Sequence, residues 1–502
     1  MDKRFEGLTQ EQYKNEIIQR ENLLRHFFTS KYHRLRIILF YIKRFIYLTL
    51  FRDFKNKFTD KEKITKVVKQ KTKKNKNAIK VLYDFQTFSA QKVGGISRLF
   101  YEIINYLNRD KDFTPELAIR YADNYYLQKA DFLADKRIIK NPPPIRHFPE
   151  LFPPAPFSED NLLVNFFRSL FLKILRLKYF FYPGVSFFSL DPTFYYTYYQ
   201  ANEKTAIEFF KKGNFDIFHP TYYNTYFLRY LKGRPFVITV HDMIHELFAP
   251  HHHPNDIISS QKKILCEKAA KIITVSKQTK KDLIRIFKIP EEKIEVIYHA
   301  SSFSDKKIKK IKIKNLPKKY LLFVGQRVGY KNFNFFIKSI APLIRKEKDL
   351  NVVCVGDYPS SGPFTSDEKK LFKDLKIEKK MIYYKADDLT LANLYINALA
   401  FVFPTLYEGF GIPVLEAFSL GCPVVCSEIP VLKEVAEDGA LYFNPKNKKS
   451  IYEVVKKIVY DKNLRKKMIE KGKIINKKYS WKKTVEKNKK IYKEIILRFY
   501  KK

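Results

Sequence analysis

Two glutamates, Glu408 and Glu416, are the residues whose type and spacing point most directly to chemistry. They lie eight positions apart in the segment PTLYEGFGIPVLEA (404–417). An apolar run at 398–403 precedes them and predicts a buried strand. Pro413 suits the first position of a helix, because the N–H group that proline lacks has no partner there in any case. The pattern therefore predicts that Glu408 lies in a glycine-rich loop and Glu416 about one turn into a helix.

The start of this helix, which is expected to stop at Gly421, predicts an anion site. We expect free backbone N–H groups at Val414 and Leu415, at the positive end of the helix, where they could hold a diphosphate. Carboxylates beside it could accept hydrogen bonds from hydroxyls of a sugar or a ribose. A lone pair of glutamates would be read as solvated charge, but the flanking strand, glycines and proline favour a site.

A strand followed by EGFGIPVLE and a helix resembles the donor-sugar signature of the GT-B retaining glycosyltransferases of family four. The resemblance covers most of residues 79–500. It implies an α/β fold with two Rossmann-like, doubly wound domains facing a cleft. It also implies that Glu408 contacts the donor sugar and that Glu416 binds the nucleotide ribose. The remaining donor-binding residues that it implies in this segment are Gly409, Phe410, Gly411, Ile412, Val414 and Leu415.

Two further motifs match the resemblance in the expected order. In VGGISR, the adjacent Gly94 and Gly95 would let the backbone approach a ligand closely, although a tight turn explains such a pair equally well. The surrounding YDFQTFSAQKVGGISRLF (83–100) resembles a branch that includes mannosyltransferases building bacterial surface polysaccharides. In TVHD, His241 and Asp242 end a predicted strand, where ligands of open α/β sheets bind. By resemblance they are catalytic, with His241 close to the transferred sugar.

A third motif, FVGQRVGYKNF (323–333), supplies positive charge. Arg327 and Lys331 lie in a predicted strand-to-helix loop, where two cations could neutralise a diphosphate leaving group without a metal ion. An ordinary basic loop is the alternative in so basic a protein. The Arg-x3-Lys spacing also departs from that of most relatives, in which the lysine lies closer to the arginine. We expect no cofactor and no metal ion, only a nucleotide diphosphate sugar as donor.

The alternation of strand and helix patterns predicts a parallel, doubly wound sheet in each of two domains. The expected parts are a basic amphipathic extension (1–78), an acceptor domain (79–300) with an aromatic-basic helical insertion (141–200), a linker (301–318), a nucleotide-sugar domain (319–480) and a terminal helix (481–502). By resemblance, the terminal helix crosses back to the first domain.

The composition is strongly basic, with 96 Lys and Arg against 52 Asp and Glu and a net charge of +44 in 502 residues. Such a charge suits nucleic acid or an anionic membrane surface. No nucleic-acid-binding module is recognisable. Basic amphipathic stretches at 35–51 and 161–182 favour membrane contact, with a solvated or packed helix as the alternative. No apolar run is long enough to span a membrane, and the N-terminus is unlike a signal peptide. A peripheral position on the cytoplasmic face of the cell membrane is therefore expected.

Cysteine and histidine usage argues against a metal site. The Cys-x3-Cys pair has no partner at zinc spacing, so buried thiols in a reducing compartment are expected. The run His251–His253 cannot direct all its rings at one ion from a regular element. The four cysteines are Cys266, Cys354, Cys422 and Cys426.

The predicted activity is transfer of a hexose from a nucleotide diphosphate sugar to a glycan or lipid-linked acceptor in bacterial surface polysaccharide synthesis. GDP-mannose is the first expected donor and a UDP-hexose the second. Retention of anomeric configuration is implied by the resemblance alone. Two alternatives remain at this point: a catalytically silent membrane-bound glycan scaffold and a basic nucleic-acid-binding protein.

Overall fold

The computed structural model describes residues 73–122, 124–128, 130, 139–140, 197–248, 257–304, 307–356 and 363–500. Three predicted segments lie outside the described residues: the extension up to residue 72, residues 141–196 of the insertion predicted at 141–200, including the stretch at 161–182, and His251–His253. By compactness the chain divides into two units. One comprises 1–69, 119–123 and 133–205, and the other comprises 70–118, 124–132 and 206–502. The second unit contains both large sheets and every predicted site residue.

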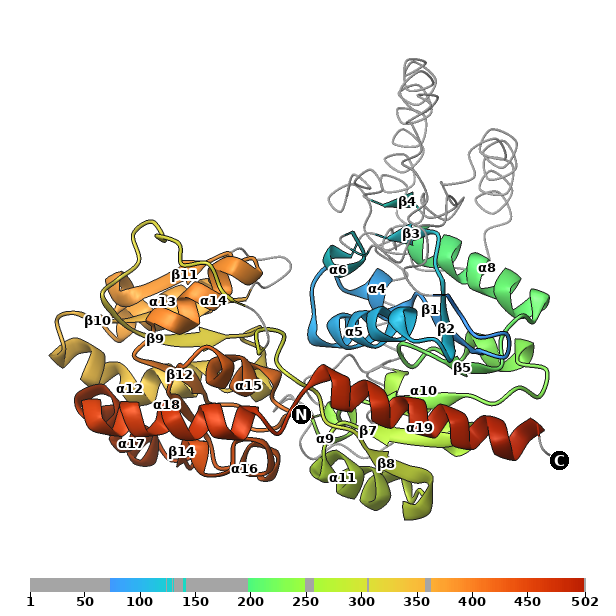
Figure 1. Ribbon diagram of the computed structural model, residues 1–502. Helices are drawn as coiled ribbons and strands as arrows, with labels where there is room; N and C mark the ends of the chain where they lie inside the picture. The colour runs from blue at the N-terminus through green and yellow to red at the C-terminus, as the bar shows by residue number, and fades with distance from the viewer. Residues whose placement is uncertain are drawn as a thin grey trace, which may run out of the picture. The chain divides into compact units, whose positions relative to one another are not determined.

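The elements carry the labels used in Figure 1. The strands are β1 (Ile79–Asp84), β2 (Phe113–Ala118), β3 (Tyr121–Ala122), β4 (Ile139–Lys140), β5 (Ile217–His219), β6 (Val237–Val240), β7 (Lys271–Thr274), β8 (Ile294–Val296), β9 (Lys319–Val324), β10 (Leu350–Val355), β11 (Met381–Tyr384), β12 (Ala400–Phe403), β13 (Val424–Ser427) and β14 (Ala440–Phe443). The helices are α4 (Gln86–Ala90), α5 (Gly95–Arg109), α6 (Tyr125–Gln128), α8 (Thr197–Lys212), α9 (Ile244–Leu247), α10 (Ile258–Lys268), α11 (Lys277–Phe287), α12 (Phe333–Lys346), α13 (Ser366–Asp374), α14 (Asp388–Asn397), α15 (Ile412–Ser419), α16 (Pro430–Ala436), α17 (Lys448–Tyr460), α18 (Lys462–Asn476) and α19 (Trp481–Tyr500).

The first parallel sheet is built from two three-stranded ladders. Their orders are β2-β1-β5 and β6-β7-β8, and a parallel bridge between Phe218 and Phe236 joins them. The direction in which strands are added to the sheet therefore reverses between β1 and β5. In open α/β sheets, ligands bind outside the carboxyl ends of the strands at such a reversal. The glycine pair Gly94-Gly95 follows β1 in sequence, and His241 follows β6.

The second sheet is fully parallel, with strand order β11-β10-β9-β12-β13-β14. Here the order reverses between β9 and β12. All residues of β12 and β13 are buried, as expected for central strands covered on both faces. The two parallel sheets confirm the doubly wound α/β fold. They also identify the loops after β9 and β12 as the place where a ligand of this sheet should bind.

The core of the second sheet explains why helices lie on both of its faces (Figure 1). Ala400 and Val402 of β12 belong to a buried cluster with residues of α12 and α17. Phe401, which points to the opposite face, packs against Tyr395 of α14 with ring centroids 5.4 Å apart. The predicted apolar stripe of α12 is confirmed as buried: Phe333, Phe336, Ile337, Ile340, Leu343 and Ile344.

The terminal helix α19 is fixed to the first sheet by a buried hydrogen-bond chain. The hydroxyl of Tyr492 lies 2.9 Å from the hydroxyl of Tyr83 and 2.7 Å from Nδ1 of His219. Nε2 of His219 lies 2.9 Å from Oγ1 of Thr239. Burial lowers the pKa of His219 to about 3, so this ring is neutral and exchanges hydrogen bonds rather than charge. The chain ties α19 to β1, β5 and β6.

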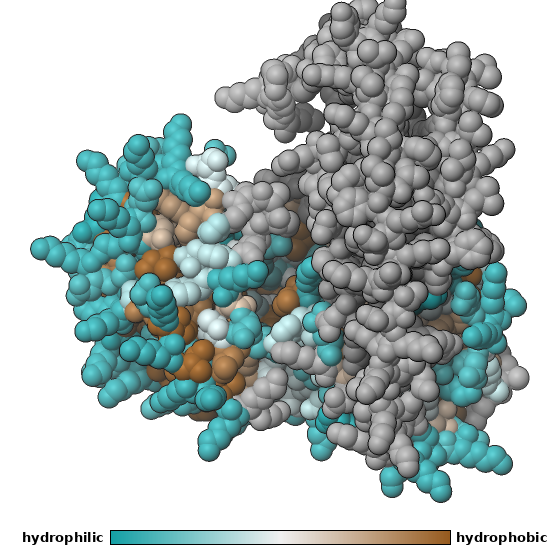
Figure 2. Space-filling model, turned by 90° about the horizontal axis from the view of Figure 1, so that it is seen from above, coloured by the Kyte–Doolittle hydropathy of each residue, from teal (hydrophilic) through white to brown (hydrophobic). Residues whose placement is uncertain are grey.

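Hydrophilic residues dominate the rim of the described surface in Figure 2, with hydrophobic ones gathered between them. No described helix is both long enough and apolar enough to cross a bilayer. The four cysteines are buried free thiols, as predicted. Large exposed hydrophobic side chains on the described part of the chain include Val93, Ile257, Ile264, Leu389, Tyr460, Ile474, Leu497, Phe499 and Tyr500.

Candidate functional site

The loops after β9 and β12 bring two predicted site residues into direct contact. Nζ of Lys331 lies 2.5 Å from Oε1 of Glu408, and the two side chains are 15% and 12% exposed. The ammonium also lies 5.2 Å from the centre of the Phe403 ring, at the end of β12. Opposite charges that are this close and largely desolvated fix one another in place. The strand reversal thus carries an ion pair that remains partly open to solvent.

Helix α15 begins at Ile412, one residue before the predicted first position at Pro413, and ends just before Gly421, as predicted. Gly411 caps it with φ +103°, a conformation that favours glycine, and Pro413 occupies its first turn. Gly421 follows its end with φ +68°. Glu416 lies one turn into the helix, as expected. The N–H group of Val414 is not free, however: it donates to the carbonyl of Gly411 at 3.0 Å, because the first turn closes tightly. That expectation was wrong for Val414.

The glycine-rich loop before α15 packs against the first sheet's domain. A Cβ atom on Gly409 would lie 1.8 Å from the carbonyl oxygen of His241, so only glycine fits there. The carbonyl of Gly409 accepts a hydrogen bond of 3.1 Å from Oγ1 of Thr279. A Cβ on Gly95 would lie 3.4 Å from Cδ1 of Ile412. The structure therefore brings together the two glycine motifs and the His241 corner that the sequence singled out.

The same contact places the first residues of α5 and α15 beside each other. Gly95 is the first residue of α5 and Ile412 the first of α15. Gly94, the N-cap of α5, is in an extended conformation and accepts a hydrogen bond from the N–H of Arg98. Helix N-termini carry partial positive charge, so two that approach each other favour an anion nearby.

Glu416 is buried, and its charged partner comes from the other half of the molecule. Its Oε1 lies 3.8 Å from Nη1 of Arg98, and its Oε2 accepts a hydrogen bond of 3.3 Å from the hydroxyl of Tyr395. Nη2 of Arg98 lies 3.0 Å from Oδ2 of Asp388. Burial raises the pKa of Glu416, and the guanidinium of Arg98 opposes that rise.

His241 is a buried, neutral histidine with hydrogen-bonding capacity to spare. Its backbone N–H donates to the hydroxyl of Tyr223 at 2.9 Å. Burial, reinforced by His299, His219 and Lys262, holds the pKa of its ring well below the usual value. Its Nε2 has no hydrogen-bond partner among the described residues. This nitrogen therefore keeps the capacity to form a hydrogen bond with a ligand group.

Asp242 is held at the adjacent position by a lysine that the sequence reasoning missed. Its Oδ1 accepts a hydrogen bond of 3.0 Å from the N–H of Ile244. Its backbone carbonyl accepts one of 3.0 Å from Nζ of Lys262, which also pairs with Glu246 at 2.9 Å. Lys262 is fully buried. Nothing in its segment ISSQKKILCEK distinguishes it from the adjacent Lys263, so no sequence signal could have found it.

The side chain of Phe410 anchors the donor loop and does not line it. It is buried among Tyr298, His299 and Tyr479, with ring centroids 5.2–5.9 Å away. Any contact of this residue with a sugar would therefore use its backbone.

Arg327 lies in a different network from Lys331. Its side chain is fully buried, and its Nε lies 2.7 Å from Oε1 of Glu368, the residue that closes the capping box of α13. Its Nη1 donates to the carbonyl of Gly356 at 2.7 Å, and its Nη2 donates to that of Pro363. These bonds hold α13 to the loops after β9 and β10. The expected role at the diphosphate stays a prediction, and it would require this network to open.

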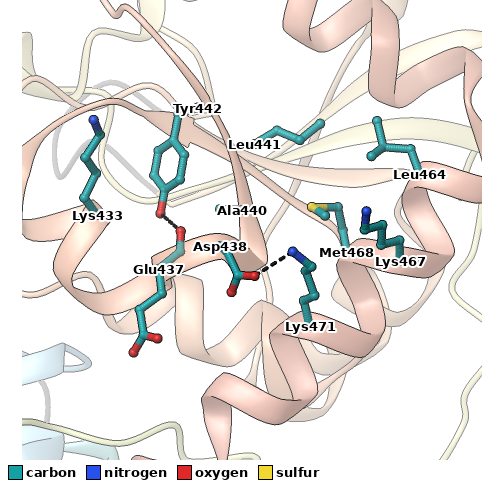
Figure 3. Close-up of a pocket in the computed structure, with 10 residues that line it drawn as sticks. All are labelled: Lys433, Glu437, Asp438, Ala440, Leu441, Tyr442, Leu464, Lys467, Met468 and Lys471. Carbon is teal, nitrogen blue, oxygen red and sulfur yellow. Dashed lines mark hydrogen bonds and ion pairs between the residues drawn. The ribbon is translucent and has the colours of Figure 1, made fainter.

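No group of three His, Cys, Asp or Glu residues suited to a metal ion occurs within the described ranges. A cavity of about 620 Å³ lies on α16, β14 and α18 (Figure 3). Its polar lining is surface charge, including an ion pair of 2.5 Å between Lys471 and Asp438. It contains none of the predicted site residues. The cavity is therefore separate from the site described above.

Two sequence models of known families match the chain. The model described as "Glycosyl transferases group 1" matches residues 304–474, and the one described as "Glycosyltransferase Family 4" matches residues 170–300. Together they take in more than half of the chain and include Lys331, Glu408, Glu416 and His241. The chain belongs to the group 1, family 4 glycosyltransferases. This membership confirms the resemblance drawn from the motifs.

Named relatives include enzymes of O-antigen synthesis. The chain is 32% identical over 227 residues to the O-antigen chain mannosyltransferase RfbU of Salmonella typhimurium, covering 44% of this chain and 60% of that one. It is 29% identical over 259 residues to the O-antigen chain mannosyltransferase B of Escherichia coli, covering 49% of this chain and 66% of that one. The match thus spans less than two thirds of the length of either relative.

Solved structures support the fold. A glycosyltransferase from Rickettsia africae matches with a TM-score of 0.54 at 18% identity, over 84% of this chain and 99% of that one. Anabaena HepE, solved in complex with UDP and glucose, matches with a TM-score of 0.57 at 13% identity, over 83% and 100%. Such neighbours have the GT-B fold, which confirms the predicted fold class.

The buried Arg327 network generates a prediction that separates its two possible roles. Arg327→Met should lower the midpoint of thermal unfolding, because Glu368 would keep a buried charge without its partner, at a cost of about 3–5 kcal/mol. Arg327→Met/Glu368→Gln should recover part of that loss. If Arg327→Met instead leaves the melting temperature unchanged and abolishes nucleotide binding, Arg327 is a donor-site residue.

Proposed function

We propose that this protein transfers a hexose from a nucleotide diphosphate sugar to a glycan or lipid-linked acceptor, with retention of anomeric configuration. The observation that carries the proposal is the Lys331–Glu408 pair at the strand reversal of the second sheet, next to the loop that enters α15. Family membership supports the activity class. A silent scaffold would have no need to retain Lys331, Glu408, Glu416 and an unpaired His241 nitrogen in one region.

The donor's diphosphate is held by one ammonium and two helix ends. Lys331 supplies a full positive charge, and the adjacent N-termini of α5 and α15 supply partial positive charges. In the first turn of α15, the N–H of Val414 is already used within the helix. A phosphate contact at Leu415 stays part of the proposal. These charges make a metal ion unnecessary, and Glu416 binds the ribose.

The sugar is oriented by Glu408 and by the ring of His241. A neutral His241 can donate a hydrogen bond to a sugar hydroxyl through Nε2, the atom without a protein partner. Glu408 forms an ion pair with Lys331, and this pairing favours a role for Glu408 in binding over a role as covalent nucleophile. The acceptor oxygen therefore attacks the anomeric carbon from the face that the phosphate leaves. The carbon–phosphate oxygen bond breaks, and the leaving diphosphate takes the acceptor's proton.

GDP-mannose is the first candidate donor, because RfbU and mannosyltransferase B are named as mannosyltransferases. A UDP-hexose is the second, since HepE was solved with UDP and glucose. The acceptor proposed from the same relatives is a lipid-linked or growing surface polysaccharide. The enzyme would then work at the cytoplasmic face of the membrane as a peripheral protein. The net charge of +44 supports contact with anionic lipid. Nucleic acid is not proposed as a partner, because the sequence contains no recognisable nucleic-acid-binding module.

Membrane contact predicts co-sedimentation of the full chain with vesicles that contain an anionic phospholipid. Binding should be absent with purely zwitterionic vesicles and should weaken as salt rises from about 0.1 M to about 1 M, because screening shortens the range of the attraction. Equal binding to both kinds of vesicle, or binding that salt does not affect, would contradict this part of the proposal.

The function itself is tested by transfer of labelled sugar from GDP-mannose, UDP-glucose and UDP-galactose to a lipid-linked oligosaccharide acceptor, without added metal. One donor should be used in preference to the others. Glu408→Gln should lower kcat by about 100-fold, through loss of a charged contact at the reacting sugar. Glu428→Gln, which alters an exposed Glu–Lys pair, is the matched control and should retain activity. Equal activity of the wild type, Glu408→Gln and Glu428→Gln would show that Glu408 is not a site residue.

A further inference from the structure

Arg98 belongs to the domain of the first sheet, and its side chain reaches Glu416, the candidate ribose-binding carboxylate in the domain of the second sheet. It lies in the first turn of α5, and its side chain is only 7% exposed. Its guanidinium pairs with Asp388 at 3.0 Å and lies 3.8 Å from Glu416. The rings of Tyr126 and Phe303 lie 5.2 Å and 5.6 Å from its central carbon. A planar cation held by two rings and an acid has little rotational freedom.

The two contacts of this guanidinium differ in kind. At 3.0 Å the contact with Asp388 is a charge-assisted hydrogen bond, whereas 3.8 Å from Glu416 is within ion-pair range but too long for a hydrogen bond. Oε2 of Glu416 is used by Tyr395. Among the described residues nothing donates a hydrogen bond to its Oε1. Arg98 therefore neutralises Glu416 without using the oxygen that a ribose hydroxyl would need.

A buried carboxylate needs such a partner to stay ionised. Burial raises the pKa of Glu416, Asp388 adds to the rise, and Arg98 and Tyr395 oppose it. Only the ionised form presents acceptors on both oxygens to a hydroxyl donor. The charged or titratable groups that interact with this carboxylate are Arg98 on α5, Tyr126 on α6, and Asp388 and Tyr395 on α14, and Glu102 on α5 interacts with Arg98. Arg98 is the cation among them.

We propose that Arg98 is a positioning residue for nucleoside recognition, holding Glu416 ionised and oriented so that its Oε1 accepts from a ribose hydroxyl of the donor. This inference rests on the proposed function. Because Arg98 lies three residues after Gly95, in the domain of the first sheet, ribose recognition by the second sheet's domain depends on a residue of the first. Arg98 touches no reacting atom and acts through Glu416.

The test is the affinity ratio between a nucleoside diphosphate and its 2′,3′-dideoxy analogue, measured by calorimetry on the full chain. The probe is GDP or UDP, whichever binds the wild type more tightly. A hydrogen bond to a charged group corresponds to a ratio of about 10- to 100-fold in the wild type. Arg98→Met should lower the ratio about 10-fold, close to that of Glu416→Gln. Arg98→Lys, which retains the charge but not the planar geometry, should give an intermediate ratio.

Arg109→Met is the matched control, since it makes the same change at the exposed far end of α5. It should leave the ratio unchanged. If Arg98 merely ties the two halves together, its variants will weaken both ligands equally and preserve the ratio. If Arg98→Met has the same affinity ratio as the wild type, the inference is overturned and the proposed function stands. If only Arg98→Lys folds, the same ratio in that variant decides the question. A wild type that binds neither GDP nor UDP overturns both.

Discussion

The contact between Lys331 and Glu408 is the interaction on which the candidate site depends. It forms because β9 and β12 are neighbours in a sheet whose strand order reverses between them, so that the loops leaving their carboxyl ends meet. Each charge would be costly to desolvate alone, and together they stay partly exposed at low cost. A ligand with a diphosphate and a hydroxylated sugar offers each member of this pair a new partner of the right kind. The sheet topology thus decides which side chains can act together.

The first sheet's domain completes the site through close backbone approach. Gly409 packs so tightly on the carbonyl of His241 that no side chain fits, and a Cβ atom on Gly95 would lie 3.4 Å from Cδ1 of Ile412. The glycines of both motifs therefore allow the two loops to pack against each other, in addition to any close approach of the backbone to a ligand. Because α19 is tied to β1 and β5 through Tyr492, the chain end also supports the sheet that carries His241.

Much of this was accessible from the sequence, for identifiable physical reasons. The strands and helix α15 follow from apolar runs and from Pro413 and Gly421, whose backbone preferences are local. The sequence could not reveal the partners of charged residues, because these come from distant segments. Arg327 was expected at the diphosphate but lies buried against Glu368, and Lys262 resembles any surface lysine. Arg98 is part of the VGGISR motif, but its contact with Glu416 joins residues 318 positions apart and exists only in the folded chain.

The most direct test of this account is the affinity of GDP and UDP for Lys331→Met compared with the wild type, measured by calorimetry without added metal. The account predicts that one of the two nucleotides binds the wild type and that the substitution weakens it by about 10- to 100-fold, the worth of a charged hydrogen bond. Lys338→Met, on the exposed face of α12, should bind as the wild type does. Unchanged affinity in Lys331→Met would contradict the account, because the diphosphate would then lie elsewhere.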